Sequence, residues 1–252
     1  MKGRCYLLSL KEFWEGADRE RYFKEALHKV DGTRREKARR MQTEKSKAAC
    51  LGAGLLLQFA VQAALLETEG EDILRQRDML PWEQEAARYG LTVYTISQIL
   101  GQLGETLDLK VYCNGNGKPY LQDYPLYFNL SHSGNYVVCA VSAREVGVDI
   151  QEYKKTDVER LARRFFSEEE QGILMACTNE KEQCKLFFRL WTRKEAYGKL
   201  TGEGIAAVID KNMLRVKNGE PSVTGSGDDT PLFWQEWELD GYAITLCQYG
   251  IK

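Results

Sequence analysis

Two pairs of polar side chains have the spacing needed to share one face of a strand or a helix. In "VGVDIQ", Asp149 and Gln151 stand two residues apart, so their side chains point to the same face of a predicted strand over 146–151. Val148 and Ile150 point to the opposite, apolar face. Because carboxylate and amide oxygens bind hard cations such as Mg²⁺, this pair is a candidate metal site. The alternative is the polar face of an ordinary edge strand.

The second pair is Glu195 and Lys199, which are four residues apart on a predicted helix over 180–200. This spacing places them on one helix face with Trp191. The alternative is a surface ion pair, which stabilises a helix by only about 0.3–0.5 kcal/mol. The surrounding segment "LWTRKEAYGKLTGEG" combines a large aromatic side chain, three cations and a glycine-rich end, which is more than a solvated helix face requires.

A third candidate is the basic helix start that contains Arg34, Arg35 and Lys37. A helix N-terminus combined with arginine and lysine side chains is suited to bind phosphate, and the alternative is a solvated charged face. The first 50 residues carry 14 Lys and Arg against 8 Asp and Glu, although the whole chain has a net charge of -2. A local basic patch on a mildly acidic protein indicates a small anionic ligand or an acidic protein partner.

Two short polar segments lie beside predicted strands. In "YFNLSHSG", the strand ends at Leu130, and Ser131 and His132 belong to the polar loop that follows. This loop is either an ordinary turn or a cluster of donors aimed at an anion. In "NGNGKP" (114–119), the composition predicts a turn. Its functional interpretation is a backbone that lets a flat ring approach, with Lys118 near a phosphate.

The composition shows what kind of protein carries these candidates. With 252 residues and 43% apolar composition, the chain can bury a substantial core in one large domain or two smaller ones. Seven scattered cysteines without a CxxC pair argue against a disulfide framework and a zinc site, and predict reduced thiols in the cytoplasm. The apolar segment 48–66 could span a membrane by composition, but Gln58 and Gln62 favour a buried core helix.

The other elements must position the candidate side chains. We expect helices over 18–30, 34–66, 92–104, 157–166, 167–176 and 180–200. We expect strands over 4–10, 127–130, 136–142 and 146–151, a short pair around 114–119, and a C-terminal hairpin over 231–250 that turns at Asp240-Gly241. Residues 217–231 read as a surface loop. This order predicts an α+β protein with two halves of similar build.

The order of the segments resembles the 4′-phosphopantetheinyl transferase family, of the large single-chain type that acts on peptidyl and acyl carrier proteins. The resemblance runs through "GKP", "FNLSHSG", "VGVDIQ", "FFSEEE" and "LWTRKEAYGKLTGEG" over 118–204, and more loosely through "TRREKARR" at 33–40. It implies an enzyme that transfers the 4′-phosphopantetheine group of coenzyme A to a carrier serine, with Mg²⁺, and releases adenosine 3′,5′-bisphosphate. It also implies two α+β halves related by a pseudo-two-fold axis, 1–146 and 147–252, with coenzyme A in the cleft between them.

The resemblance implies roles for the acidic and basic residues of the second half. Asp149 and Glu195 resemble the family's Mg²⁺ ligands, and Gln151 stands where many members carry another acid. Glu195 is also the implied general base for the carrier serine, with relay through a water as the alternative. Lys199 is implied to neutralise the diphosphate and to stabilise the leaving bisphosphate. We therefore expect Glu195, Lys199 and Asp149 to be catalytic.

The resemblance also implies a coenzyme A site. The residues expected near the 3′-phosphate are Ser131, His132, Arg34 and Lys37. Gly117, Lys118 and Pro119 are expected on the adenine side of the cleft, and Lys199 at the diphosphate. Cations and a protonated imidazole would distinguish coenzyme A from a ligand without the 3′-phosphate.

The family's carrier protein is an acidic helical partner. The basic segment 153–166 is the candidate docking surface, because charge complementarity speeds association. We expect a cytoplasmic monomer that binds neither nucleic acid nor membrane. One alternative is a non-catalytic carrier- or nucleotide-binding module with a degenerate metal site, which Gln151 supports. Another is a nucleic-acid binder using 34–47, against which the overall acidity and the lack of interleaved aromatic residues count.

Overall fold

A computed structural model describes residues 3–68, 90–209, 211–214, 216–217, 220–221, 232–239 and 241–250. The chain forms two compact units, each of mixed α and β structure. Unit 1 comprises 1–112 and 119–143, and unit 2 comprises 113–118 and 144–252. The predicted division into two similar halves, 1–146 and 147–252, and the pseudo-two-fold axis between them stay predictions.

Unit 1 is built on a four-stranded sheet in the order β2-β1-β6-β5. The strands are β1 (Arg4–Ser9), β2 (Leu91–Tyr94), β5 (Tyr127–Ser133) and β6 (Tyr136–Ser142). β1 runs parallel to β2 and antiparallel to β6, and β5 is antiparallel to β6. β6 is buried along its whole length, which agrees with its continuous run of apolar residues.

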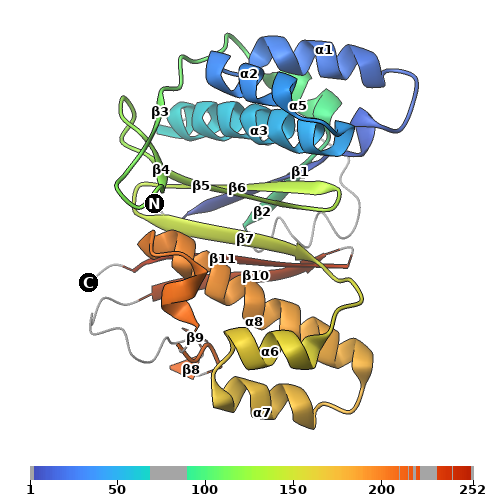
Figure 1. Ribbon diagram of the computed structural model, residues 1–252. Coiled ribbons are helices and arrows are strands. Elements are labelled where there is room, and N and C mark those ends of the chain that lie inside the picture. Colours follow the sequence, from blue (N-terminus) through green and yellow to red (C-terminus); the bar gives the residue numbers. More distant parts are fainter. Residues whose placement is uncertain are drawn as a thin grey trace. The chain divides into compact units, whose positions relative to one another are not determined.

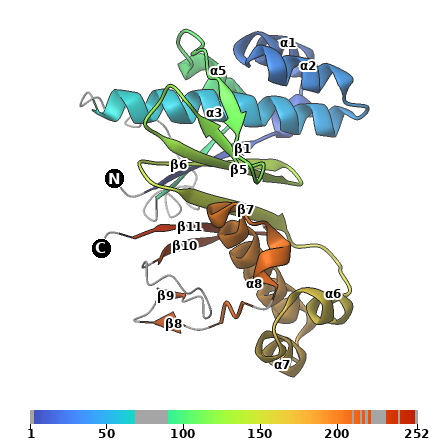
Figure 2. The ribbon, with the colours of Figure 1, turned by 60° about the vertical axis from the view of Figure 1, so that its left-hand side comes forward.

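The helix α3 (Glu44–Thr68) lies along this sheet, and α1 (Arg19–Lys29) and α2 (Gly32–Arg40) pack on its other side (Figures 1 and 2). In the described part of the chain, only the helical segment Glu44–Leu66 is long and apolar enough to cross a membrane, and most of it is buried inside the protein. The Gln58 amide exchanges two hydrogen bonds with the backbone of Leu107, at 2.8 and 3.0 Å. The prediction of a buried core helix is confirmed.

Two sequence-based predictions in this unit are wrong in part. The single helix expected over 34–66 is interrupted, because Met41 has an extended backbone and Thr43 starts a new helix by accepting a hydrogen bond from Ser46 N. The helix expected over 92–104 begins as the strand β2 and becomes helical only in α5 (Ile96–Gln102). There Thr95 and Gln98 form a capping box, which fixes the helix start.

Unit 2 is built on the three-stranded antiparallel sheet β10-β11-β7. Its strands are β7 (Val146–Glu152), β10 (Leu232–Leu239) and β11 (Tyr242–Tyr249). The expected C-terminal hairpin is confirmed; its turn residue Asp240 and most of the loop 217–231 lie outside the described residues. The long helix α8 (Glu180–Thr201) packs across β7 and β11, and α6 (Val158–Phe165) and α7 (Glu168–Ala176) pack against α8 (Figure 1).

Local signals set the ends of the unit 2 helices. Ser167 and Glu170 form the capping box that starts α7, as the sequence predicts. Gly202 ends α8 with a left-handed backbone at φ 77°. The remaining short elements are η1 (Lys11–Phe13), β3 (Val111–Cys113), β4 (Pro119–Leu121), η2 (Ile205–Val208), β8 (Val216–Lys217) and β9 (Glu220–Pro221).

Gly147 allows the backbone of α8 to approach β7 closely. A Cβ at this position would overlap the carbonyl oxygen of Ala196 and lie 2.6 Å from Leu200 N. Both contact atoms belong to the helix backbone, so the helix itself would have to move. Gly147 therefore lets α8 lie close to β7. Glu195 and Lys199 are the sequence neighbours of Ala196 and Leu200, so this close packing also brings them toward β7.

We expect Gly147→Ala to lower the free energy of unfolding by about 1–3 kcal/mol, the usual cost of overpacking a core. Urea unfolding monitored by circular dichroism measures the change. Gly172→Ala in α7 is the matched control, because a Cβ there meets nothing within 4 Å and alanine favours a helix. If Gly147→Ala is as stable as the control, the close approach of α8 to β7 is not required for the fold.

Candidate active site

An acidic centre in unit 2 joins β7 to α8. Asp149 lies in the middle of β7 and is only 2% exposed. Its Oδ1 accepts a hydrogen bond from Lys199 Nζ at 2.6 Å, and its Oδ2 accepts one from Gln151 Nε2 at 3.1 Å. Lys199 Nζ also donates to the carbonyl of Val148 at 3.2 Å. Asp149 and Gln151 thus lie on one face of β7, as predicted, and a cation from α8 neutralises the buried carboxylate.

Glu195 lies half-buried one helical turn before Lys199. Burial raises the pKa of its carboxyl group, and the negative charge of Asp149 raises it further, whereas Lys199 offsets part of the rise. A carboxylate whose ionisation is opposed by the charge of Asp149 marks a place where an added cation would be favourable. Glu195 therefore differs from an ordinary acid on a helix surface.

The donor set of this centre fits a hard divalent cation. Asp149 and Glu195 supply carboxylate oxygens and Gln151 an amide oxygen, and Mg²⁺ prefers oxygen ligands. Within the described ranges, no group of three His, Cys, Asp or Glu side chains converges anywhere. The protein thus offers two carboxylates here, and the amide group of Gln151 adds an uncharged oxygen.

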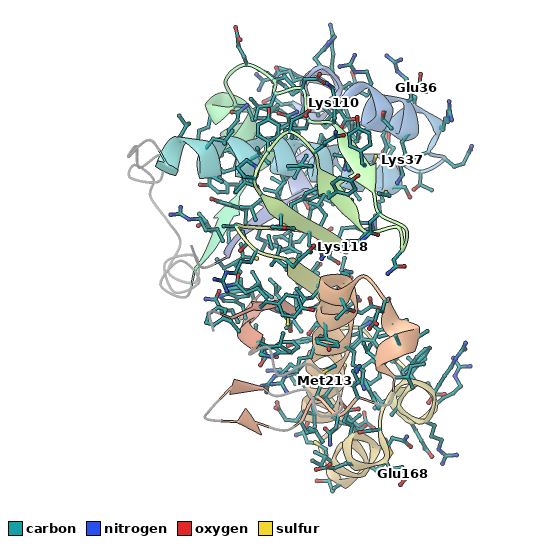
Figure 3. The ribbon with its side chains drawn as sticks, turned by 90° about the vertical axis from the view of Figure 1, so that its left-hand side faces the viewer. Glu36, Lys37, Lys110, Lys118, Glu168 and Met213 are labelled. Carbon is teal, nitrogen blue, oxygen red and sulfur yellow. The ribbon has the colours of Figure 1, made fainter. Side chains whose placement is uncertain are left out.

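A basic pocket forms within unit 1, between α2, α3 and β5. It is a cavity of about 350 Å³ whose lining includes Arg34, Lys37, Ser131 and His132. Lys37 is labelled on α2 in Figure 3. The structure therefore brings together the four unit 1 residues that the resemblance implied near the 3′-phosphate. Their role as ligands of that phosphate stays a prediction.

Ser131 and His132 reach the pocket from a strand. The sequence predicted a loop over 131–134, but β5 continues to Ser133, and His132 pairs with Val137 of β6. The turn is confined to Gly134 and Asn135. Cross-strand pairing with the apolar β6 extended the strand beyond the point where apolar residues end.

The neighbouring arginines of α2 have different roles. Arg35 donates from Nε to the carbonyl of Leu27 at 2.6 Å and from Nη2 to that of Val30 at 3.1 Å, so its guanidinium group caps the C-terminal end of α1. Arg34 lines the cavity instead. The start of α2 is already capped, because Asp31 accepts a hydrogen bond from Arg34 N at 2.8 Å. The pocket thus relies on side chains.

Sequence reasoning missed the part of the pocket that α3 supplies. Ser46, Ala49, Cys50 and Ala53 line the cavity from this helix. Burial raises the pKa of the Cys50 thiol, while the charges of Arg34 and Lys37 offset part of that rise. The available signal was the spacing of these small residues at three and four positions along one face of a helix.

The segment 113–118 holds Gly117 and Lys118, whereas Pro119 begins β4. Gly117 has a left-handed backbone at φ 80°, as a tight turn requires. Lys118, labelled in Figure 3, pairs with Glu145 and donates to the carbonyl of Leu200 at 2.7 Å. Its ammonium group is thus bound to the C-terminal end of α8, and its expected closeness to a phosphate stays a prediction.

The candidate docking segment 153–166 contains α6. Its basic side chains are exposed, namely Lys154, Lys155, Arg160, Arg163 and Arg164. Val158, Ala162 and Phe166 are buried and hold the helix on unit 2. Within α6, Arg163 pairs with Glu159, so part of its charge is compensated locally.

Comparison with known proteins adds a second line of evidence. Residues 145–247 match the model of the 4′-phosphopantetheinyl transferase superfamily. Over 143 residues, the chain is 34% identical to 4′-phosphopantetheinyl transferase Sfp of Bacillus subtilis, covering 56% of this chain and 63% of that protein. It is 39% identical to 4′-phosphopantetheinyl transferase psf-1 of Bacillus pumilus, covering 53% of this chain and 58% of the relative.

A third relative is 4′-phosphopantetheinyl transferase HetI of a Nostoc species, at 39% identity over 56% of this chain and 63% of the relative. The chain thus spans 58–63% of the length of these three curated relatives. A solved structure, the holo-[acyl-carrier-protein] synthase of Thermotoga maritima, aligns with 43% of this chain and 64% of that chain at 21% identity. Its TM-score of 0.35 is too low to support a conclusion about the fold.

Proposed function

Because residues 145–247 match the model of the 4′-phosphopantetheinyl transferase superfamily, we propose that the chain transfers the 4′-phosphopantetheine group of coenzyme A to a serine of an acyl or peptidyl carrier protein. The products are the holo carrier and adenosine 3′,5′-bisphosphate. The observation that carries the proposal is the acidic centre, in which Asp149, Glu195 and Lys199 meet inside the matched region. This centre combines two carboxylates with a cation suited to a diphosphate.

We assign the chemistry of transfer to this centre. Asp149, Glu195 and Gln151 would hold Mg²⁺, which supplies charge stabilisation to the diphosphate when bound. Glu195 takes the proton from the carrier serine, since it is the acid with the raised pKa and the greater exposure of the two. Lys199 neutralises charge on the diphosphate and on the departing bisphosphate. Asp149 holds Lys199 in place for this role.

We assign the 3′-phosphate of coenzyme A to the basic pocket of unit 1. Arg34, Lys37 and His132 are the cationic or protonatable side chains of its lining. Charge-assisted hydrogen bonds from such groups suit a phosphate with nearly two negative charges.

We further propose that the carrier docks on α6 and that the protein acts as a cytoplasmic monomer. The exposed basic residues of 153–166 support docking, because the carrier proteins that this family modifies are acidic. Arg160→Glu should slow carrier association at low salt more than at high salt if this surface is used. Lys11→Glu in unit 1 changes a basic side chain by the same charge and serves as the control.

A direct assay separates transfer from the alternative of a non-catalytic binding module, which Gln151 favours. The protein is incubated with coenzyme A, Mg²⁺ and a panel of apo carriers, and adenosine 3′,5′-bisphosphate is quantified by chromatography. Formation that requires both the metal and a carrier supports the enzyme. Tight binding of coenzyme A without any bisphosphate released would support the binding module.

The pocket assignment predicts a preference for coenzyme A over dephospho-coenzyme A. We expect the 3′-phosphate to tighten binding by about tenfold or more, the effect of one or more hydrogen bonds to a charged group. His132→Ala should reduce the preference, since it removes one of these groups from the lining. Calorimetric dissociation constants for both nucleotides test this. Equal affinity of the wild type for the two would contradict the assignment.

The donor set predicts that the metal site depends on coenzyme A. With only two acids, the protein should bind Mg²⁺ weakly alone and more tightly when the diphosphate supplies further oxygens. By linkage, Mg²⁺ should raise the affinity for coenzyme A by the same factor. Gln151→Glu should tighten metal binding to the free protein and reduce this coupling. Calorimetric titration with and without coenzyme A measures both. An unchanged metal affinity in Gln151→Glu would show that residue 151 does not contact the metal.

A further inference from the structure

The side chain of Arg34 crosses α3 at a glycine. A Cβ at Gly54 would overlap Arg34 Cδ, lie 3.2 Å from Arg34 Nε and lie 2.6 Å from Val30 Cγ1. An alanine there is therefore incompatible with the observed path of the arginine. Gly54 leaves the space through which the apolar stem of Arg34 reaches the basic pocket.

The other contacts of Arg34 hold its guanidinium group only loosely. Nη1 donates to the carbonyl of Cys50 at 3.4 Å, and Nε lies 3.7 Å from Asp31 Oδ2. Nε is buried and has no hydrogen-bond partner among the described residues. Because these bonds are long, the position of the guanidinium group depends on the packing of the stem against Gly54.

An added methyl group at position 54 would displace Arg34 in preference to Val30. Val30 is 1% exposed and belongs to the core of unit 1, and its branched side chain has few alternative rotamers. The Arg34 side chain is 20% exposed and has several rotatable bonds, so it can swing toward solvent. The same change two residues earlier differs, because a Cβ at Gly52 would overlap Leu10 Cδ2 in the core.

We propose that Gly54 is a positioning residue that sets the selectivity of the basic pocket for coenzyme A over nucleotides without a 3′-phosphate, by holding the stem of Arg34 against α3. This inference rests on the proposed function, because it takes the 3′-phosphate as the ligand of the pocket. It concerns a residue that contacts no ligand and acts only through Arg34.

The test compares dissociation constants for coenzyme A and dephospho-coenzyme A by calorimetry in Gly54→Ala. We expect the ratio of the two constants to fall by about tenfold, because the phosphate loses a charge-assisted hydrogen bond, while dephospho-coenzyme A binds as in the wild type. Gly101→Ala is the control, since a Cβ at this exposed helical glycine meets nothing within 4 Å. Gly52→Ala should lower the melting temperature without changing the ratio.

A double-mutant cycle separates positioning from general damage. In an Arg34→Ala background, Gly54→Ala should have no further effect on the ratio, because no stem remains to be displaced. If Gly54→Ala does not fold, the double variant Val30→Ala/Gly54→Ala takes its place. It removes the rigid neighbour Val30, so that Arg34 remains as the contact of the new methyl group. Val30→Ala alone is its control. An unchanged ratio in the folded variant, or the same fall with and without Arg34, overturns the inference.

Failure of this inference can be distinguished from failure of the proposed function. Transfer to a carrier by the wild type is measured independently of the ratio. If the wild type transfers the group and discriminates between the nucleotides but Gly54→Ala discriminates equally, only the role of Gly54 is wrong. If the wild type binds both nucleotides equally, the pocket assignment and the inference fall together. If it binds neither, the proposed function falls as well.

Discussion

Replacing Glu195 with glutamine is expected to slow phosphopantetheine transfer by at least about 100-fold, the loss typical for removal of a general base. Glutamine has the same shape and a similar helix propensity, so α8 should persist. The change removes the carboxylate that would accept the proton of the carrier serine and hold the metal. Single-turnover measurement of holo carrier formation determines the loss. Glu182→Gln, the same change at an exposed position of α8, should keep the wild-type rate.

The raised pKa of Glu195 adds a pH dependence to this expectation. Only its ionised form would hold Mg²⁺, so the affinity of the metal-free protein for Mg²⁺ should fall as pH falls through a pKa above the usual value for glutamate of about 4.3. Since the folded-state pKa is raised, ionised Glu195 costs stability at neutral pH, and Glu195→Gln should be at least as stable as the wild type there. A near-normal rate in a folded Glu195→Gln variant would remove Glu195 from the mechanism.

Replacing Lys194 with methionine is expected to lower the free energy of unfolding by about 3–5 kcal/mol, because it leaves a buried carboxylate without its partner. Lys194 and Glu170 are both fully buried, with Nζ 3.0 Å from Glu170 Oε2. Lys194 Nζ also donates to the carbonyls of Val208, Ile209 and Lys211, at 2.6–3.1 Å. This single ammonium group thus connects α8 to α7, to the last residue of η2 and to the chain that follows it.

Control variants can distinguish the stability lost by breaking the buried pair from the effect of losing a lysine side chain in general. Lys181→Met, at an exposed position of the same helix, should change stability by no more than about 0.5 kcal/mol. Lys194→Met/Glu170→Gln should recover part of the loss, because it removes the uncompensated charge. Urea unfolding of the four proteins measures these values. A loss below about 1 kcal/mol in Lys194→Met would contradict the role of the pair, since a broken buried pair costs several times more.

The two pairs that make up the acidic centre were accessible from the sequence through local periodicity, and the family resemblance joined them into one expected site. A spacing of two on a strand and of four on a helix placed Asp149 with Gln151, and Glu195 with Lys199, before any tertiary contact was known. The structure adds that α8 crosses β7 closely enough for Lys199 to reach Asp149. Neither spacing contains that contact, which depends on the close approach of α8 to β7 that Gly147 permits.

Other features depended on tertiary context, which residue types do not reveal. Arg34 and Arg35 look equivalent in the sequence, yet only Arg34 lines the cavity, whereas Arg35 caps α1. The strand β5 continues through His132 because β6 offers it a partner. Lys194 reads as one more cation of a charged helix, but α7 and the residues after η2 enclose it. At each of these positions, packing against other elements decides the role or local structure of the residue, and its residue type alone does not.

The intact mass of an apo carrier protein after incubation with this protein, coenzyme A and Mg²⁺ tests the proposed transfer most directly. We expect a mass gain equal to one 4′-phosphopantetheine group, confined to the carrier's serine and absent from a carrier in which that serine is replaced by alanine. With Glu195→Gln, we expect no gain over the same time. An unmodified carrier across a panel of acyl and peptidyl carriers, with the wild-type protein folded and coenzyme A bound, would contradict the proposed transfer.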